Sequence, residues 1–584
     1  MKNTLSRIAP LFLLLTMWLA ACTGGGPARV WLKSPGWSRG VAVGQTELAS
    51  PAAMAFDSAG HLFVFLVGQS PGKSSLVRLD PMDGAIGEPI GLDDLDAKRV
   101  VSPRMVAVGS DLWLFWIDGD RLQMVAVNPD NEAVGPSSTV SGSRPVADFS
   151  LAQVGRAEPT VWFSGGVDAP GVYQASLNGA EPKRITAEGV RPWIVLDQNG
   201  DLHATWIVLP ESQGLAPIHY ASYPQGGLEN GQEWILAEPS LTPTDGLQGP
   251  LLGLTQDRAM VFYVITLRTG LEAGKIKPFY FSYPLDDPSQ VTAPTTFEVP
   301  GAADLKYDLA PSDGLKVGER ASPQITGPPG QHVSQISIPS RVLPEMAVAL
   351  RARIEFRMNQ EQTQVGLIFL DGSGPVGYQQ LTFTPAGSSQ PSLLVDSEDY
   401  GYLTWLEPAE GSGYTTFLSS TRPSLVEAFR GVTGQDVSQM VSESVFGMLS
   451  GIVLVPLALV WMIAPLLVIV VSSFWRSGDD RLSSASTWIP LALAIAVYWL
   501  AKRAFLPQVF SYVPFSAWVP IIGPAVGAVL RIGLPILGTA LALWVAYSYT
   551  YRRDRTSPTF FVLIFSAVDA MITMALYGGL FLGF

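Results

Sequence analysis

Cysteine and histidine are scarce: the 584 residues include one cysteine and four histidines. A single cysteine excludes an intrachain disulfide, a cysteine-based zinc site and a catalytic thiol pair. The histidines are scattered, with no HExxH motif and no pair at helical spacing, at His61, His203, His219 and His332. We therefore expect no metal site and no cofactor.

Basic residues are also few, since 37 Lys and Arg stand against 50 Asp and Glu and give a net charge of −13. Nucleic-acid affinity depends on a stripe of Lys and Arg that neutralises phosphates. No such run occurs outside short stretches beside apolar segments. The composition therefore argues against a nucleic acid partner.

The N-terminus has the pattern of a secretory signal. Lys2 and Arg7 precede an apolar run over residues 8–18 that is too short to span a bilayer. The tetrapeptide Leu-Ala-Ala-Cys that ends at Cys22 follows, and it resembles the bacterial lipobox. The resemblance implies lipidation of Cys22 by a diacylglycerol and an acyl chain such as palmitate. The alternative is an ordinary cleaved signal with an incidental cysteine.

From about residue 30 to 420, short apolar stretches alternate with Gly, Pro, Asn and Asp and leave no room for long helices. A loose repeat consists of a proline, an apolar strand, a polar turn and a second strand that ends in an aromatic residue. Its copies begin at Pro51, Pro103, Pro192, Pro250 and Pro391, with a degenerate copy at Pro145. We expect one or two more copies between residues 300 and 385.

The copies begin about 40–60 residues apart, which is close to the period of propeller repeats. Hairpin signals such as Asp83-Gly84 follow them, so two strands and a hairpin give four-stranded units. The region resembles β-propeller proteins, which implies about seven blades, within a range of roughly six to eight. The last copy, which begins at Pro391, has a strand-like sequence pattern for only three strands. We expect residues 29–48 to supply the missing strand and close the ring.

Two turns, Asp57-Ser58-Ala59-Gly60 and Asp197-Gln198-Asn199-Gly200, resemble the Asp boxes of sialidase-like propellers. The match is imperfect, because two residues rather than one separate Asp from Gly. The arginine cluster, tyrosine and acid of that family have no matching motif here, so no catalytic residue is assigned. Asp197, Asn199 and Asp201 also alternate like the start of a calcium loop, but the later glutamate is absent. Turn chemistry accounts for these residues.

The C-terminal part is mostly apolar and contains four segments that approach or exceed the roughly 20 residues needed to span a bilayer. These segments are Phe446–Trp475, Trp488–Phe505, about Arg531–Tyr549 and Pro558–Phe581. Arginines in the connections 476–486 and 551–557 place those connections in the cytoplasm, and hence the N-terminal domain outside.

Two stretches beside these spans are ambiguous. Residues 516–530 are rich in Pro and Gly, and they favour a broken or re-entrant entry to the third span over one long helix. Residues 423–445 carry an apolar stripe at helical spacing that predicts a short amphipathic helix. The alternative for this connector is a loosely ordered linker.

Asp569 lies inside the fourth span, where a carboxylate is costly and normally has a partner or a function. Counting depth at about 1.5 Å per residue places Lys502 and Arg503 within reach of it and Arg531 near the outer boundary. We expect a structural intramembrane ion pair between Asp569 and Lys502 or Arg503.

Together these patterns predict an all-β propeller followed by an all-α transmembrane domain of four helices. The predicted parts are a lipoprotein signal peptide (1–21), a lipidated linker (22–28), the propeller (29–422), a juxtamembrane connector (423–445) and the four-helix domain (446–584). Because outer membranes host barrels, we expect a multi-pass protein of the bacterial cytoplasmic membrane with its propeller on the extracytoplasmic side.

The predicted function is binding of a protein or glycan ligand, as a sensor or as a subunit of a membrane complex. The expected partners are that ligand and the lipid bilayer, and no enzymatic activity is predicted. A sialidase-like glycoside hydrolase and a component of a membrane transporter are the alternatives. Fold alone does not select between them.

Overall fold

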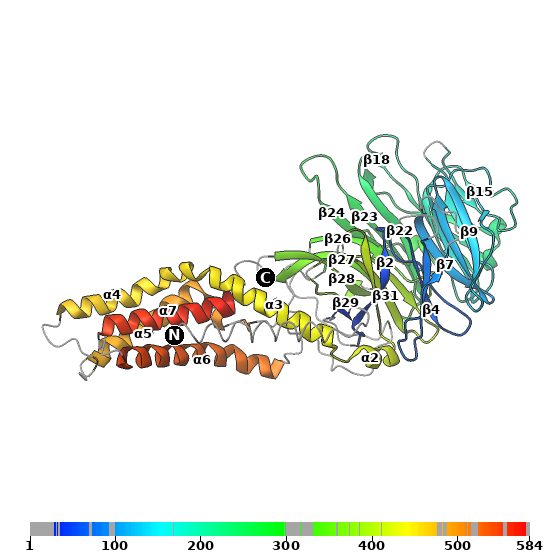
Figure 1. Ribbon diagram of the computed structural model, residues 1–584. Coiled ribbons are helices and arrows are strands. Elements are labelled where there is room, and N and C mark those ends of the chain that lie inside the picture. Colours follow the sequence, from blue (N-terminus) through cyan, green and yellow to red (C-terminus); the bar gives the residue numbers. More distant parts are fainter. Residues whose placement is uncertain are drawn as a thin grey trace. The chain divides into compact units, whose positions relative to one another are not determined.

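The structure is a computed structural model that describes residues 29–579 except 31, 33–35, 69–72, 93–99, 167–168, 297, 300–316, 318–330, 358–359, 373, 385, 410, 476–481, 483–486, 511, 515–523 and 553–556. It divides into a β unit that spans Gly26–Phe356 and Glu361–Gly431 and a helical unit that includes Val432–Phe584 (Figure 1). The predicted signal peptide and Cys22 lie outside the described residues.

Seven antiparallel sheets follow one another along the β unit and form the blades of a β-propeller, as the sequence predicted. Blade 1 contains β3 (Met54–Phe56), β4 (Leu62–Leu66), β5 (Ser75–Leu79) and β6 (Ile90–Gly91). Blade 2 contains β7 (Val100–Val108), β8 (Asp111–Asp118), β9 (Arg121–Asn128) and β10 (Ala133–Val134), with β11 (Ser138–Thr139) paired to β9. Blade 3 contains β12 (Asp148–Ala152), β13 (Thr160–Ser164), β14 (Val172–Gln174) and β15 (Lys183–Thr186).

The next three blades repeat this order. Blade 4 contains β16 (Val190–Leu196), β17 (Leu202–Ile207), β19 (Ile218–Tyr223) and β20 (Gln232–Ala237), while β18 (Gly214–Leu215) and β21 (Ser240–Leu241) form a separate pair. Blade 5 contains β22 (Gly246–Leu254), β23 (Arg258–Thr266), β24 (Ile276–Pro284) and β25 (Thr295–Thr296). Blade 6 contains β26 (Gln331–Ser337), β27 (Met346–Arg357), β28 (Gln360–Asp371) and β29 (Gly374–Gln380), so the described part of the 300–385 region holds one blade.

Blade 7 joins the two ends of the β unit and confirms the predicted ring closure. It takes β30 (Ser389–Val395), β31 (Gly401–Pro408) and β32 (Tyr414–Ser420) from the last repeat. Its remaining strands, β2 (Gly40–Thr46) and β1 (Arg29–Val30), come from the N-terminal segment. Strand β2 pairs with β32 in antiparallel register, with Val41 opposite Leu418. This pairing covers the two sheet edges that an open ring would expose.

The aromatic residue that ends the second strand of each repeat packs between blades. Trp116, Trp162, Trp206 and Trp405 are fully buried, and each belongs to a hydrophobic cluster shared by two adjacent blades. Similar clusters lie at the other blade junctions. Removing a buried tryptophan side chain typically costs about 3–5 kcal/mol, so these residues contribute strongly to holding the ring together.

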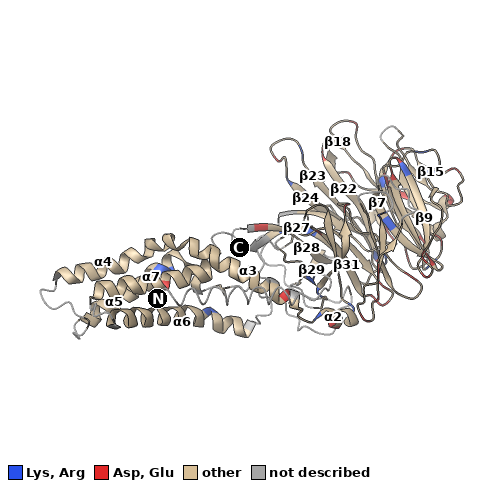
Figure 2. Ribbon diagram, in the orientation of Figure 1, with Lys and Arg blue, Asp and Glu red and all other residues tan. Residues whose placement is uncertain are grey.

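The helical unit contains α3 (Gly434–Val453), η4 (Val455–Ala458), α4 (Leu459–Trp475), α5 (Trp488–Phe505), η6 (Pro507–Phe510), α6 (Pro524–Arg552) and α7 (Pro558–Tyr577). Four helical stretches are long and apolar enough to cross a membrane: Val455–Phe474, Trp488–Phe505, Ala525–Tyr551 and Pro558–Tyr577. Figure 2 shows that few charged residues lie along them. Helix α7 packs against α3, α4, α5 and α6.

Two predicted boundaries in this unit need correction. The predicted first span is divided, because α3 ends at Val453 and a turn that contains Pro456 precedes α4. The expectation of a broken entry is wrong for residues 524–530, which are the first residues of one 29-residue helix, α6. A proline is well tolerated at the first position of a helix, so Pro524 begins α6 rather than interrupting it. The preceding residues 515–523 lie outside the described part.

The connector contains two helices rather than a loose linker. Helix α2 (Pro423–Phe429) belongs to the β unit, where Leu425 and Phe429 are buried in the cluster between blades 7 and 1. Helix α3 begins after a capping box in which the Thr433 hydroxyl accepts the Asp436 N–H and the Asp436 carboxylate accepts the Thr433 N–H. The capping box satisfies backbone donors at the start of α3 and so fixes its first turn.

Candidate functional site

The innermost strands of five blades share a bulge. Register shifts occur in β7, β16, β22, β26 and β30. At each bulge one residue has positive φ: Ser102 (50°), Arg191 (56°), Gly249 (85°), Gln335 (52°) and Gln390 (52°). In four of these strands the next residue is the proline of the repeat. Proline cannot donate to a ladder, so a bulge is where a strand tolerates it.

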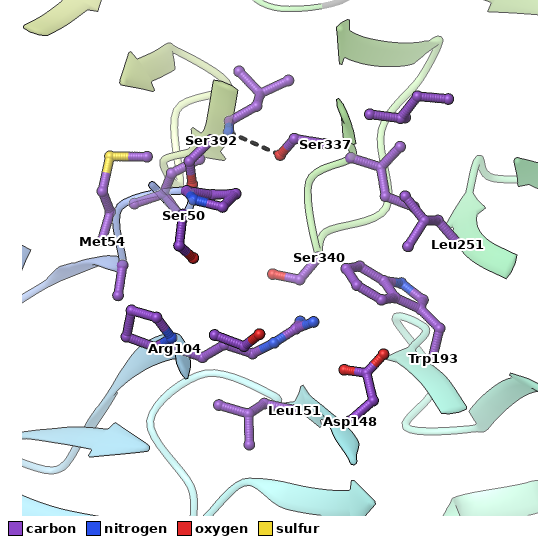
Figure 3. Close-up of a pocket in the computed structure, with 18 of the residues that line it drawn as sticks. Ser50, Met54, Arg104, Asp148, Leu151, Trp193, Leu251, Ser337, Ser340 and Ser392 are labelled. Atoms are coloured by element: carbon purple, nitrogen blue, oxygen red, sulfur yellow. Dashed lines mark hydrogen bonds between the residues drawn. The ribbon is translucent and has the colours of Figure 1, made fainter. Parts of the chain in front are cut away.

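Hydrogen bonds between neighbouring inner strands accompany these bulges. The Gln248 amide bonds both to the Ile336 N–H at 3.2 Å and to the Ile336 carbonyl at 3.0 Å. The Ser337 hydroxyl accepts the Leu393 N–H at 3.1 Å, a bond drawn in Figure 3. Holding a non-glycine residue at positive φ costs on the order of 1 kcal/mol, and these inter-blade bonds help to offset that cost.

The inner strands enclose a cavity of about 330 Å³ at the centre of the ring. Residues from the first strand of every blade, or directly beside it, line this cavity. The volume is near the lower limit of ligand pockets in proteins, which suits a small molecule or one terminal group of a larger one.

Charged side chains gather on one side of the cavity, in the adjacent blades 2, 3 and 4. These are Arg104 of β7, Asp148 of β12 and Arg191 of β16. The Arg104 guanidinium carbon lies 4.6 Å from the centre of the Trp193 ring, a cation–π contact. The Trp193 indole N–H donates to the Leu252 carbonyl at 3.1 Å and is thereby fixed. Figure 3 shows Arg104 and Asp148 directed into the same space beside Trp193.

Burial is the main influence on the pKa values of Arg104 and Asp148. Burial raises the pKa of Asp148, against the opposing effects of Arg104, Arg191 and the hydrogen bond from the Phe149 N–H. Burial also lowers the pKa of Arg104, and Asp148 partly offsets this. Arginine remains charged even so. The cluster therefore carries two cations and one carboxylate that holds its proton more readily than usual.

The other side of the cavity is uncharged and rich in hydroxyl groups. Blades 1, 6 and 7 contribute Ser50, Ser337, Ser340 and Ser392. A serine hydroxyl both donates and accepts hydrogen bonds. The cavity can thus offer charged donors on one side and hydroxyl groups on the other.

The charged residues lie toward one face of the propeller. We call the face with the turns between the first and second strands of each blade the turn face. Asp148 and Arg191 stand at the start of their inner strands, away from the turn face. Helix α2 lies at the turn face, where Arg422 just before it bonds to Asp396 at 2.9 Å. The chain therefore leaves the propeller at the face opposite these charged residues.

The Asp turns are structural. In the turns of Asp57 and Asp197, one carboxylate oxygen accepts the N–H groups two and four residues ahead at 2.8–2.9 Å. A third such turn begins at Asp396. It was missed in the sequence because its positive-φ position holds Asp399 rather than a glycine. Each turn satisfies its own backbone, so none of them requires a ligand.

The described histidines do not form a site together. His61 and His219 each pair with one carboxylate. The His203 ring lies 2.7 Å from the Tyr220 hydroxyl inside blade 4, and burial lowers the pKa of His203. The side chain of His332 is not among those that the structure describes. Among the described residues, no group of three His, Cys, Asp or Glu could hold a metal ion.

In the helical unit, Asp569 is fully buried and accepts four hydrogen bonds. One carboxylate oxygen accepts from Lys502 Nζ at 2.7 Å, the Tyr498 hydroxyl at 2.7 Å and the Thr573 hydroxyl at 3.3 Å. The other accepts from the Thr539 hydroxyl at 2.9 Å. Such a satisfied network is typical of a structural ion pair.

The structure thus brings Asp569 together with Lys502 and leaves the other predicted candidate apart. Lys502 is buried, whereas Arg503 and Arg531 are exposed. Consecutive residues on a helix point about 100° apart, so only one of Lys502 and Arg503 can face the bundle interior.

No sequence pattern identified Arg104, Asp148, Arg191 or Trp193 as site residues. One signal was present: Arg104 follows the repeat proline of its strand directly, and Arg191 precedes the proline of its own. Equivalent positions in most other copies hold uncharged residues such as Gly249. The signal is not sufficient by itself, because Arg144 also precedes a repeat proline but packs on Tyr173 and does not line the cavity.

Comparison with known proteins gives structural matches only. No protein-family model and no curated protein matches the sequence. A Penicillium chrysogenum alpha-L-arabinanase in complex with arabinobiose has 11% identity and a TM-score of 0.37, over 66% of this chain and 98% of that one. A Fusarium graminearum alpha-L-arabinofuranosidase has 9% identity and a TM-score of 0.36, over 66% and 99%. A Dyadobacter fermentans protein of unknown function has 10% identity and a TM-score of 0.36, over 66% and 99%. Such similarities assign no activity to this chain.

Proposed function

We propose that this chain is a membrane-anchored β-propeller that binds a protein or glycan ligand in its central cavity, as a sensor or as a subunit of a membrane complex. The main observation that supports this proposal is the cavity, because all seven blades contribute to its wall and polar groups converge on it. A concave site with a few convergent polar groups is the usual form of a ligand pocket.

The proposed location is the extracytoplasmic side of a bacterial cytoplasmic membrane. Four apolar helices are long enough for the anchor. The signal sequence and the lipobox-like motif at Cys22 support export and lipidation, and the arginines beside the spans support the orientation. Helices rather than a barrel favour the cytoplasmic membrane.

Binding is favoured over glycoside hydrolysis by the composition of the cavity wall. A glycosidase of the common type needs two carboxyl groups on either side of the scissile bond. Among the residues that the structure describes, Asp148 is the only carboxylate lining this cavity. The hydrogen-bonded state of Asp569 likewise fits a structural role better than a transport site.

The test is binding of the detergent-solubilised full chain to glycan and peptide arrays. A Ser340→Trp variant would fill the cavity from an exposed position, and Ser137→Trp, exposed at the outer edge of blade 2, is the matched control. We expect Ser340→Trp to lose binding and Ser137→Trp to keep it. Equal binding by both variants would place the ligand elsewhere, and release of new reducing ends from a bound glycan would favour the hydrolase alternative.

A further inference from the structure

Two guanidinium groups in the cavity have no hydrogen-bond acceptor among the described residues. Neither the Arg104 nor the Arg191 side chain donates a hydrogen bond or forms an ion pair within the part of the chain that the structure describes, although Arg104 stacks on Trp193. Both side chains are half-buried. Arginines so placed normally have their donors satisfied, so unused donors beside a cavity indicate an anionic ligand.

The charge balance narrows the class of anion. Arg104 and Arg191 together with one ionised Asp148 leave a single positive charge on the cavity wall. A ligand with one carboxylate is therefore neutralised whether or not Asp148 is ionised, whereas a phosphate dianion would be neutralised only while Asp148 holds its proton. The planar guanidinium also fits a carboxylate through two parallel hydrogen bonds.

We propose that the cavity binds a carboxylate-bearing ligand of about monosaccharide size, with Arg104 and Arg191 donating to its carboxylate. This inference rests on the proposed function and specifies its ligand. The opposite wall offers the hydroxyl groups of Ser50, Ser340 and Ser392, which suit further polar groups on the same molecule.

Asp148 makes this binding sensitive to protons. Its carboxylate shares the wall with the two arginines, and Figure 3 shows it beside Arg104. An ionised Asp148 repels an incoming carboxylate and competes for the guanidinium groups, whereas a protonated Asp148 can donate to it. Arg104 from β7 and Arg191 from β16 are the charged groups that face Asp148 from the neighbouring blades, and both favour its ionised form. We expect affinity for the ligand to rise as the pH falls.

The experiment is isothermal titration of the full chain in detergent with D-glucuronate, its neutral counterpart D-glucose, the non-sugar carboxylate glutarate, and glucose 6-phosphate. We expect glucuronate to bind at least about ten-fold more tightly than glucose, the scale of one lost charge-assisted hydrogen bond. Arg191→Gln should lose a similar factor, while Arg184→Gln, an exposed arginine on β15, should bind like the wild type. Glutarate binding with the same dependence on Arg191 would support recognition of the carboxylate alone.

Asp148→Asn separates binding from folding, because misfolding cannot increase affinity. We expect this variant to bind glucuronate several-fold more tightly at mildly alkaline pH and to lose the pH dependence. Equal binding of glucuronate and glucose, tighter binding of glucose 6-phosphate, no binding of either carboxylate, or an unaffected Arg191→Gln variant would each overturn the inference. If a neutral ligand from the arrays bound the wild type and not Ser340→Trp, the proposed function would stand although the carboxylate inference had failed. Failure of the inference can therefore be distinguished from failure of the proposed function.

Discussion

The ion pair between Asp569 and Lys502 predicts a specific pattern of stabilities in the helical unit. Both side chains are almost completely buried, and their charged atoms are 2.7 Å apart. Asp569→Asn keeps the shape of the side chain but leaves the Lys502 ammonium buried without a counter-charge. Removing one partner of a buried pair costs about 3–5 kcal/mol. Lys502→Met should cost a similar amount, because it leaves a buried carboxylate.

The double change should cost far less than the sum of the two single changes. It removes both charges together, and replacing a buried pair by apolar groups is often nearly neutral. Some loss remains, because Tyr498 and Thr539 would lose the carboxylate that accepts their hydroxyl groups. Single losses of about 3–5 kcal/mol each and a double loss of no more than about 3 kcal/mol imply a coupling free energy of at least about 3 kcal/mol between the two sites.

The assay is unfolding in detergent, followed by the circular dichroism of helices, which the β unit contributes little to. Arg503→Met is the matched control, because Arg503 neighbours Lys502 in sequence but is exposed, and it should change stability little. Single losses that add to within about 0.5 kcal/mol would refute the coupling. An Arg503→Met variant as unstable as Lys502→Met would refute the assignment of the partner.

Four other predictions concern separate parts of the chain. Radiolabelled palmitate should mark the wild type and not Cys22→Ser, which should stay membrane-bound because helical spans anchor more firmly than one acyl chain; equal labelling of both would contradict lipidation. Deleting residues 29–48 should open blade 7 and cause aggregation, so a monomeric variant with an unchanged melting temperature would speak against ring closure. Gly451→Leu should separate α3 from α7 and lower the melting temperature in detergent, since a Cβ at Gly451 would lie 2.1 Å from the Met574 carbonyl oxygen, whereas Gly533→Leu, at an open position, should not. Because the pKa of Asp148 is higher in the folded than in the unfolded chain, Asp148 stabilises the fold at a pH below its unfolded-state pKa, and this stabilisation is lost as the pH rises through its folded-state pKa. Asp148→Asn should therefore flatten the pH dependence of the melting temperature. An unchanged pH profile would contradict this role of Asp148.

The sequence predicted the ring because its signals are local and repeated. Each copy carries its own proline, turn and aromatic residue, and a last copy with three strands required a fourth from elsewhere. The bulges were not predictable, because positive φ at a residue such as Arg191 depends on tertiary contacts, here the hydrogen bond from the Arg191 N–H to the Ser164 hydroxyl of the preceding blade. Asp399 shows the same limit, since an Asp in a glycine position is recognised only from its backbone. Helix α6 likewise continues through Pro535, which is tolerated in membrane helices because neighbouring groups can satisfy the backbone atoms that a proline leaves unpaired.

The cavity residues could not be assembled from the sequence for a geometric reason. Arg104, Asp148 and Arg191 lie about one repeat apart in the sequence, and they meet only because the ring brings every first strand to its centre. Their chemistry is also ordinary when each is taken alone. A charge on a strand is usually solvated, and only its place on the innermost strand brings it to the central cavity.

The termini of the propeller relate this cavity to the proposed membrane anchor. The Arg29 guanidinium carbon lies 5.5 Å from the centre of the Phe429 ring, and Arg39 donates to the Gly431 carbonyl at 2.8 Å. The N-terminal strand therefore starts beside the point where the chain leaves the propeller, at the turn face. Cys22 is seven residues before Arg29, a link of at most about 25 Å. If Cys22 is lipidated as we propose, the lipid and the first membrane helix both attach at the turn face. Both attachments to the β unit would then lie on the face opposite Asp148 and Arg191.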